Sequence, residues 1–207
     1  MLDCIQINTQ NSIRIETARV IRFDPYCISG TPQDADLVFL THEHYDHFSP
    51  DDLRRVLKPD TVIVAPETMR SAVSSAGFPE PFFVRAGEKY TVGGISVETV
   101  PAYNTEKPYH PKTNGWIGYI LTLDGSRIYV AGDTDAIPEA FAVHCDIALI
   151  PIGGTFTMDP SEAAALVNQI RPSAVIPTHY GSIVGSRTDG IVFSQSVHPG
   201  IRVRLLL

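Results

Sequence analysis

Short apolar runs separated by polar turns recur along most of the 207-residue chain. Runs of this length are typical of β-strands, and runs without polar alternation indicate strands that are buried on both faces. A few longer segments with helix-starting residues lie between them. The pattern predicts an α/β protein with layered sheets. The expected strands are residues 13–15, 37–40, 61–65, 95–100, 116–123, 127–131, 147–150 and 174–177.

Two segments open with the same helix signal, which is a capping side chain, a proline and an acidic residue three positions after the cap. Another candidate begins at Glu67 and runs to Gly77, where glycine can adopt the left-handed conformation that closes a helix. Pro172 prevents the last helix from continuing into the next apolar run. We therefore expect three helices, one starting after the cap Ser49, one over residues 67–77, and one starting after the cap Asp159 and running through residues 163–170.

The polar cluster His42-Glu43-His44-Tyr45-Asp46-His47 directly follows the apolar run 37–40, at the end of a strand where α/β sheets usually bind ligands. His42 and His44 project to the same side of an extended backbone and can converge on one ion. Asp46 and His47 lie where the chain turns into a helix, and they can face a second ion about 3.5–4 Å away. This donor set suits zinc, and also iron, nickel or manganese.

The spacing His42-x-His44-x-Asp46-His47 resembles the H-x-H-x-D-H signature of the metallo-β-lactamase superfamily. Within it, the chain resembles the compact metal-dependent hydrolases related to the ascorbate-phosphate lactonases more than the antibiotic-degrading enzymes. The resemblance extends over nearly the whole chain, and it implies a four-layer αβ/βα sandwich with metals at one edge. Its other motifs are Asp24-Pro25, Gly132-Asp133-Thr134 and Thr178-His179-Tyr180. The length of the chain predicts a single domain, residues 1–207.

Two further ligands rest on this resemblance. Taken alone, Gly132-Asp133 is as consistent with a turn as with a ligand, and His179 could be an ordinary surface histidine. In the family's pattern, Asp133 stands at the position of the carboxylate that bridges both metals. His179 stands at the position of the last ligand, which joins Asp46 and His47 at the second metal.

The third nitrogen of the first metal site departs from the family pattern. Many relatives carry a histidine just after the strand that corresponds to residues 95–100, where this chain has Asn104. We expect His110 to replace it, because Pro108 and Pro111 restrict the backbone on either side. The prediction places its imidazole about 2.0–2.3 Å from the metal that His42 and His44 also bind, and the alternative is a solvated loop histidine.

Several residues are candidates for supporting roles. Asp24 can orient a metal-binding imidazole through its other ring nitrogen, although an Asp-Pro turn explains it as well. Relatives often have a Gly-His pair near residues 8–12, and Gln10 or Asn11 could take over its supporting role. For His144 and His198 we expect no metal. The aromatic residues that could form either cleft wall or core are Tyr45, Tyr109, Trp116 and Tyr180.

Composition narrows the classes of partner. The net charge of −7 comes from 23 acidic and 16 basic residues, without a basic cluster that could follow a phosphate backbone, so we expect no nucleic-acid partner. No signal region or membrane-length apolar segment is visible, which favours a cytoplasmic protein without membrane association. The three cysteines lack paired spacing, and we expect reduced, mostly buried thiols without a role.

Together these features predict a metal-dependent hydrolase with two divalent ions, zinc in the first instance and Mn²⁺, Fe²⁺ or Ni²⁺ as alternatives. A metal-bound hydroxide would attack a small-molecule ester, lactone or phosphodiester, with Asp46 passing a proton to the leaving group. A nuclease of the same superfamily and a non-catalytic metal-binding protein are the alternatives. The substrate depends on loops at residues 106–114 and 181–190, whose conformation the sequence leaves open, as it does the oligomeric state.

Overall fold

The computed structural model describes all 207 residues and contains two β-sheets. The first sheet has the strand order β1-β2-β3-β4-β5-β6, and its strands from β3 onward are parallel. The second has the order β13-β12-β11-β10-β9-β8-β7, with β10 to β13 parallel. The first six strands are β1 (Ile5–Ile7), β2 (Ile13–Glu16), β3 (Val20–Phe23), β4 (Ala35–Phe39), β5 (Leu57–Pro66) and β6 (Phe82–Val84).

The second sheet is built from the later part of the chain, and helices follow or interrupt both sheets. Its strands are β7 (Lys89–Val92), β8 (Ile95–Pro101), β9 (Ile117–Leu123), β10 (Ser126–Val130), β11 (Ile147–Pro151), β12 (Ala174–Thr178) and β13 (Arg202–Val203). The α-helices are α1 (Pro50–Val56), α2 (Arg70–Ser75), α3 (Pro138–Phe141), α4 (Pro160–Ile170) and α5 (Asp189–Ser196), and the 3₁₀ turns are Leu2–Cys4, Glu67–Met69 and Lys112–Asn114.

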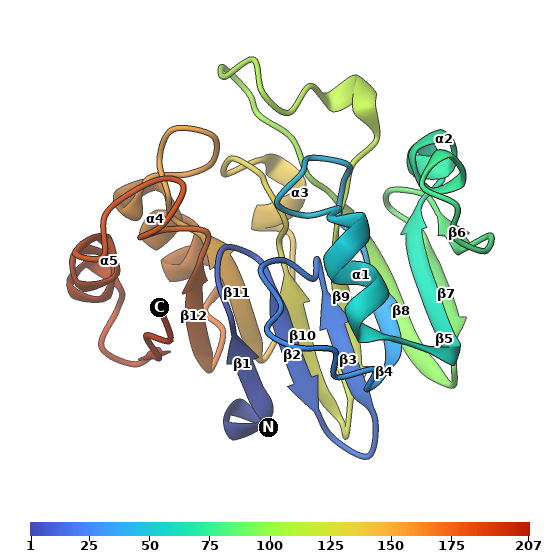
Figure 1. Cartoon of the computed structure of the whole chain (residues 1–207). Helices are drawn as coiled ribbons and strands as arrows, with labels where there is room; N and C mark the ends of the chain where they lie inside the picture. The colour runs from blue at the N-terminus through green and yellow to red at the C-terminus, as the bar shows by residue number, and fades with distance from the viewer.

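The central strands are apolar on both faces, and alternate side chains enter different cores. In β4, Leu37 and Phe39 pack in the core between the two sheets, while Val38 packs beneath α1 and α2. In β10, Val130 enters the same inter-sheet core, while Tyr129 faces α3, α4 and α5. The molecule is therefore a four-layer αβ/βα sandwich, as the family resemblance implied, with helices outside both sheets (Figure 1).

Two helices that flank the site begin as their sequences predict. The Ser49 side chain accepts a hydrogen bond from the backbone of Asp52 at the start of α1. Asp159 and Glu162 form a reciprocal capping box at the start of α4. The third expected helix is shorter than predicted, since residues 67–69 form a 3₁₀ turn before α2.

The structure also contains elements that the hydrophobic pattern did not predict. These are the short or edge strands β1, β3, β6, β7 and β13 and the helices α3 and α5. Strand β7 has exposed residues along most of its length and therefore lacks an apolar run. Helix α5 occupies part of the expected loop 181–190 and has weak amphipathic character, with only Gly190 and Phe193 buried.

Two smaller features complete the fold. Among the free cysteines, Cys4 and Cys145 are partly buried, but Cys27 is exposed, so the expectation of mostly buried thiols was wrong for that residue. It lies in the connection between β3 and β4, outside the hydrophobic core clusters. No helix has the length and apolar character needed to cross a membrane.

Candidate metal centre

The expected ligands come from four chain segments, each of which leaves the same end of one of the sheets. They follow β4, β10 and β12 directly, and His110 lies in the long connection between β8 and β9. In Figure 1 these connections gather at the upper end of the sandwich. Gly132 has a φ angle of +66°, and a Cβ atom there would lie 3.1 Å from the backbone oxygen of Ile117 in β9 and 3.3 Å from the side chain of Thr41, so glycine allows the loop after β10 to approach the motif closely.

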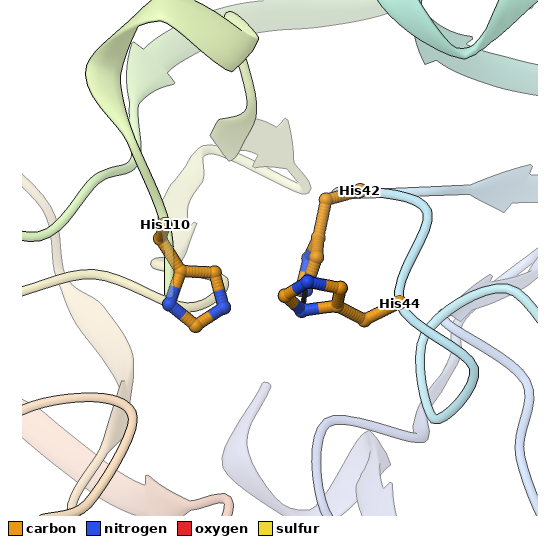
Figure 2. A group of neighbouring side chains, drawn as sticks. All are labelled: His42, His44 and His110. Atoms are coloured by element: carbon orange, nitrogen blue, oxygen red, sulfur yellow. Dashed lines mark hydrogen bonds between the residues drawn. The ribbon is translucent and has the colours of Figure 1, made fainter. Parts of the chain in front are cut away.

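The first group of side chains consists of His42, His44 and His110. His42 Nε2 lies 3.0 Å from His44 Nδ1, and the His110 ring faces this pair from the opposite side of the group (Figure 2). Trp116 packs against all three rings, with centroid distances of 4.8, 4.7 and 5.5 Å to His42, His44 and His110. The donor atoms of the three histidines lie within 4.8 Å of one another.

The second group consists of Asp46, His47 and His179, whose donor atoms also lie within 4.8 Å of one another. Asp46 Oδ2 is 3.2 Å from His179 Nε2 and 3.6 Å from His47 Nε2. All three side chains are buried. His179 has a positive φ angle of 55°, and its backbone N–H donates to the carbonyl of Gln10, which holds the loop after β12 in place.

Asp133 lies between the two groups. Its Oδ1 is 3.4 Å from His47 Nε2, and its Oδ2 is 3.3 Å from His110 Nε2 and 3.2 Å from His179 Nε2. The structure thus brings together all seven residues that the sequence singled out, from both the motif and the family resemblance. One carboxylate in this position can contact ions held by either group.

The buried polar atoms of the cluster test whether it suits metal ions. His47 Nε2, His110 Nε2 and Asp133 Oδ1 are buried without a hydrogen-bond partner, and buried polar groups are otherwise nearly always paired. Nitrogen and carboxylate donors at these positions fit zinc, and also iron, nickel or manganese. The residues present therefore fit two groups of divalent-metal ligands.

Burial and neighbouring charges shift the titration of these side chains in different directions. Burial holds the pKa of His42 well below its usual value, and lowers the pKa of the half-buried His44 as well. Burial opposes the charged form of His47 too, but Asp133 and Asp24 raise the pKa of His47 well above its usual value. Although burial opposes ionisation of Asp133, His179 and His47 hold its pKa well below its usual value, so the carboxylate that metals require is favoured.

Asp24 contacts His47, one of the candidate ligands, on the ring nitrogen that faces away from the other ligands. It is fully buried, and its carboxylate lies 2.8 Å from His47 Nδ1 and accepts hydrogen bonds from the backbone and hydroxyl of Thr41. The Asn11 amide also donates to it at 2.7 Å. Asn11, rather than Gln10, therefore contacts the residue that orients a site histidine, and the Gln10 side chain has no hydrogen-bond partner although it is buried.

Asn104 lies beside His110 and contacts its other ring nitrogen. Its Oδ1 is 3.0 Å from His110 Nδ1, which leaves His110 Nε2 facing the cluster. Sequence reasoning treated Asn104 only as a weak alternative ligand, and missed the contacts of Thr41, Asp135 and Phe156. Thr41 and Asp135 could have been found because each is a polar residue close to a ligand in the sequence. The Phe156 contact uses a backbone carbonyl, which no sequence motif reveals.

A cavity of about 250 Å³ opens onto the cluster. Of the four aromatic candidates, Tyr45 and Tyr109 line it, Trp116 packs behind the histidines, and Tyr180 is buried in the outer core. His144 and His198 are exposed and lie outside the cluster. The cavity is lined by His44, Tyr45, Asp46, Tyr109, His110, Asp133, Phe156, His179 and Ile183.

A family model described as the beta-lactamase superfamily domain matches residues 5–179. The chain belongs to this superfamily, and its two sheets with outer helices are the metallo-β-lactamase fold. Its relatives further define a compact branch of metal-dependent hydrolases. The chain is 31% identical over 195 residues to a metal-dependent hydrolase from Methanosphaerula palustris, with 89% of this chain and 87% of the relative covered.

Two further comparisons agree with this placement. The chain is 34% identical over 182 residues to a metal-dependent hydrolase from Thermococcus kodakarensis, covering 81% of this chain and 80% of that protein. A crystal structure of a metal-dependent hydrolase from Parabacteroides distasonis superposes with a TM-score of 0.82 at 32% identity, covering 97% of this chain and 91% of that one. These names describe the relatives, and the substrate of this chain does not follow from them.

Proposed function

We propose that this protein is a metal-dependent hydrolase that uses two divalent ions to cleave a small-molecule ester, lactone or phosphodiester. The observation that carries the proposal is the convergence of seven ligand-type side chains, five of which line one cavity, with Asp133 between the two groups. The ends of the sheets hold six of these side chains, and only His110 comes from the middle of a long connection.

Divalent ions held there would polarise a carbonyl or phosphoryl oxygen and lower the pKa of a bound water from about 15.7 towards about 7. We take zinc as the first candidate for both positions, because imidazole and carboxylate ligands in groups of three suit its preference for four-coordinate sites with one open position. Iron, manganese and nickel are the alternatives to be separated by measurement.

Asp46 is the chain's candidate for moving a proton, in addition to binding metal. It lines the cavity and lies 3.2 Å from His179. Burial opposes its ionisation, but the contact with His179 and the charge of His47 keep the pKa of Asp46 below its usual value. A carboxylate in this position can accept a proton from the attacking water at Oδ and deliver it to the leaving group.

The cavity favours an uncharged substrate with an apolar substituent. No lysine or arginine lines it, whereas Tyr45, Tyr109, Phe156 and Ile183 do. A substrate phosphate would therefore rely on the ions alone for its recognition, since no cationic side chain of the cavity could pair with it. We infer that neutral esters and lactones are better substrates than phosphodiesters, and that a polyanion such as nucleic acid is not a partner.

Metal analysis and a substrate panel test both parts of the proposal. Purified protein should retain between one and two transition-metal ions per chain by elemental analysis, and chelation should abolish hydrolysis. His179→Ala should lose about one ion, whereas the exposed His198→Ala serves as the control and should lose none. Protein that holds no metal after saturation with zinc or manganese and desalting would contradict the proposed function.

The substrate class is tested separately with metal-loaded protein. We expect kcat/KM, relative to the uncatalysed rate, to be at least about tenfold higher for neutral aryl esters and lactones than for bis-aryl phosphodiesters, a difference of about 1.4 kcal/mol in transition-state stabilisation. A reversed order would leave the hydrolase assignment intact and overturn the substrate class.

The rate of hydrolysis should also rise with pH through an apparent pKa near 7, because the attacking hydroxide would form from a metal-bound water.

A further inference from the structure

His110 is the one expected ligand that neither a strand end nor the H-x-H-x-D-H motif positions. Its ring is buried, its Nε2 has no hydrogen-bond partner and lies 3.3 Å from Asp133 Oδ2. For this nitrogen to bind an ion, a neutral imidazole must carry its proton on Nδ1. The surroundings of Nδ1 therefore decide whether His110 can act as a ligand.

Asn104 makes three contacts with residue 110. Its Oδ1 lies 2.9 Å from the His110 backbone nitrogen and 3.0 Å from His110 Nδ1. In return, the backbone N–H of Asn104 donates to the His110 carbonyl at 2.8 Å. The backbone N–H of His110 can only donate, so the side-chain atom of Asn104 that faces it must be the amide oxygen.

The other end of the Asn104 amide is fixed by groups that can only accept. Its Nδ2 donates to Asp135 Oδ1 at 3.0 Å and to the carbonyl of Phe156 at 2.9 Å. Asp135 is itself buried, and is anchored by Lys107 Nζ at 2.7 Å and by the backbone of Thr105 at 2.9 Å. A flipped amide would place an oxygen against two acceptors and an NH₂ group against a donor, so only one orientation satisfies the network.

We propose that Asn104 is a positioning residue, which Asp135 holds in one orientation so that its Oδ1 keeps the proton of His110 on Nδ1 and directs Nε2 into the metal centre. The Phe156 carbonyl, 3.2 Å from His110 Nδ1, acts in the same sense. The inference rests on the metal site of the proposed function, but concerns how this chain replaces the histidine of its relatives. A direct role of the Asn104 oxygen as a ligand is excluded by this arrangement, since that oxygen is used by His110.

We call this arrangement, in which Asp135 orients Asn104 and Asn104 orients His110, the relay. Two measurements on the whole protein test it, and neither depends on turnover. Nitrogen-15 NMR of the metal-free protein reads the tautomer of His110, which should be protonated on Nδ1. Competition with a chelator measures the zinc affinity of each site. Asn104→Leu keeps a similar volume without hydrogen bonds, and should give a mixed His110 tautomer and weaken one zinc ion by about 10–100-fold, while the other ion is unchanged.

Asp135→Asn is the milder variant, for use if Asn104→Leu does not fold. It retains the volume but can present an NH₂ group to Asn104, so the orientation of Asn104 is no longer enforced, and zinc affinity should fall by a smaller factor at the same site. Lys107→Met is the matched control, because it removes the lysine contact of Asp135, keeps the Thr105 contact, and leaves Asn104 in contact with His110. Its His110 tautomer should match that of the unmodified protein.

Each result decides one question. A wild-type tautomer and unchanged zinc affinity in folded Asn104→Leu or Asp135→Asn protein would overturn the relay. Equal weakening of both ions would also overturn it, because the effect would then be a general loosening of the site. Zinc binding with the expected His110 tautomer but without hydrolysis of any substrate would contradict the proposed function and leave the relay standing.

Discussion

His47 and His110 present the same atom to the metal centre, but different groups hold them. The Nδ1 of His47 lies 2.8 Å from the carboxylate of Asp24, whereas the Nδ1 of His110 lies 3.0 Å from the neutral amide of Asn104. Both partners leave Nε2 buried without a hydrogen-bond partner. A carboxylate and a correctly oriented amide can therefore both direct the Nε2 of a histidine into the metal centre.

The two partners differ in what else they hold. Asp24 follows β3 and also binds Asn11, between β1 and β2, and Thr41, after β4, so it joins three connections of the first sheet. Asn104 contacts the connection that carries His110 and the loops that hold Asp135 and Phe156. The comparison predicts that loss of Asp24 affects both folding and metal binding, whereas loss of Asn104 acts mainly on one ligand.

The largest effect is expected at the residue that both halves of the site share. Asp133→Ala removes the carboxylate that lies within 3.4 Å of nitrogens in His47, His110 and His179. We expect the affinity for both ions to fall by more than roughly 100-fold, beyond the effect of removing an outer partner of a ligand. Elemental analysis and chelator competition measure the loss. Retention of one tightly bound ion would mean that Asp133 belongs to only one group.

Asp24→Ala should have the next largest effect, and it should appear in metal-free protein. The substitution leaves the donors of Thr41, Asn11 and His47 buried without their carboxylate, and breaking a buried charged interaction in this way costs about 3–5 kcal/mol. The free energy of unfolding from urea denaturation measures this change. Asn104→Leu is the comparison variant, and its loss should be the smaller of the two.

The same two variants can also show that Asp24 and Asn104 have equivalent roles. If Asn104→Leu destabilises the metal-free protein as much as Asp24→Ala does, then the contacts of the His110 loop stabilise the fold as much as those of Asp24. If Asp24→Ala leaves unfolding unchanged but weakens zinc binding, then Asp24 acts only on the tautomer of His47. Either outcome would show that Asp24 and Asn104 do not differ as expected, with Asp24 stabilising both the fold and the metal site and Asn104 acting on one ligand.

The same contrast explains which parts of the molecule could be predicted from sequence. The metal-binding motif after residues 37–40 could be predicted because strand and helix geometry fixes the spacing of ligands at a strand end. Apolar runs similarly predicted β4, β8, β9 and β12, with small differences at their ends. Local periodicity and capping residues are sufficient where an element is buried or well capped.

Long-range partners were harder to predict. Asp135 and Phe156 lie 31 and 52 positions from Asn104 in the sequence, and only the folded connections bring them together. A family pattern pointed to a missing histidine at Asn104, and the prolines pointed to His110, but neither signal indicated that the asparagine orients the histidine. Edge strands such as β7 were missed because tertiary pairing, rather than an apolar run, stabilises them.

Asn11→Ala tests the outer part of the Asp24 anchor. It removes one buried hydrogen bond to a charged acceptor, 2.7 Å long, and leaves the contacts of Thr41 and His47. We expect the metal-free protein to lose about 1.5–3 kcal/mol of unfolding free energy, less than with Asp24→Ala, and zinc affinity to change little. A loss equal to that of Asp24→Ala would show that Asn11 alone holds the carboxylate in place.

The smallest effect is expected at the helix that follows the motif. Ser49 caps α1, with its hydroxyl accepting from the backbone of Asp52 and donating to the Asp52 carboxylate. Ser49→Ala should lower the free energy of unfolding by about 0.5–1 kcal/mol, the usual range for loss of an N-cap in a moderately favourable geometry.

The Asp52 carboxylate would still accept from the backbones of Cys27 and Ile28, so the start of α1 would keep its link to the neighbouring loop. Because α1 begins three residues after His47, a small shift of its first turn would reach the second group of ligands before the first. Zinc titration of Ser49→Ala should therefore show an unchanged affinity for the first ion, with any weakening confined to the other ion. Weakening of the first ion alone would contradict the expectation that α1 acts on the second group of ligands.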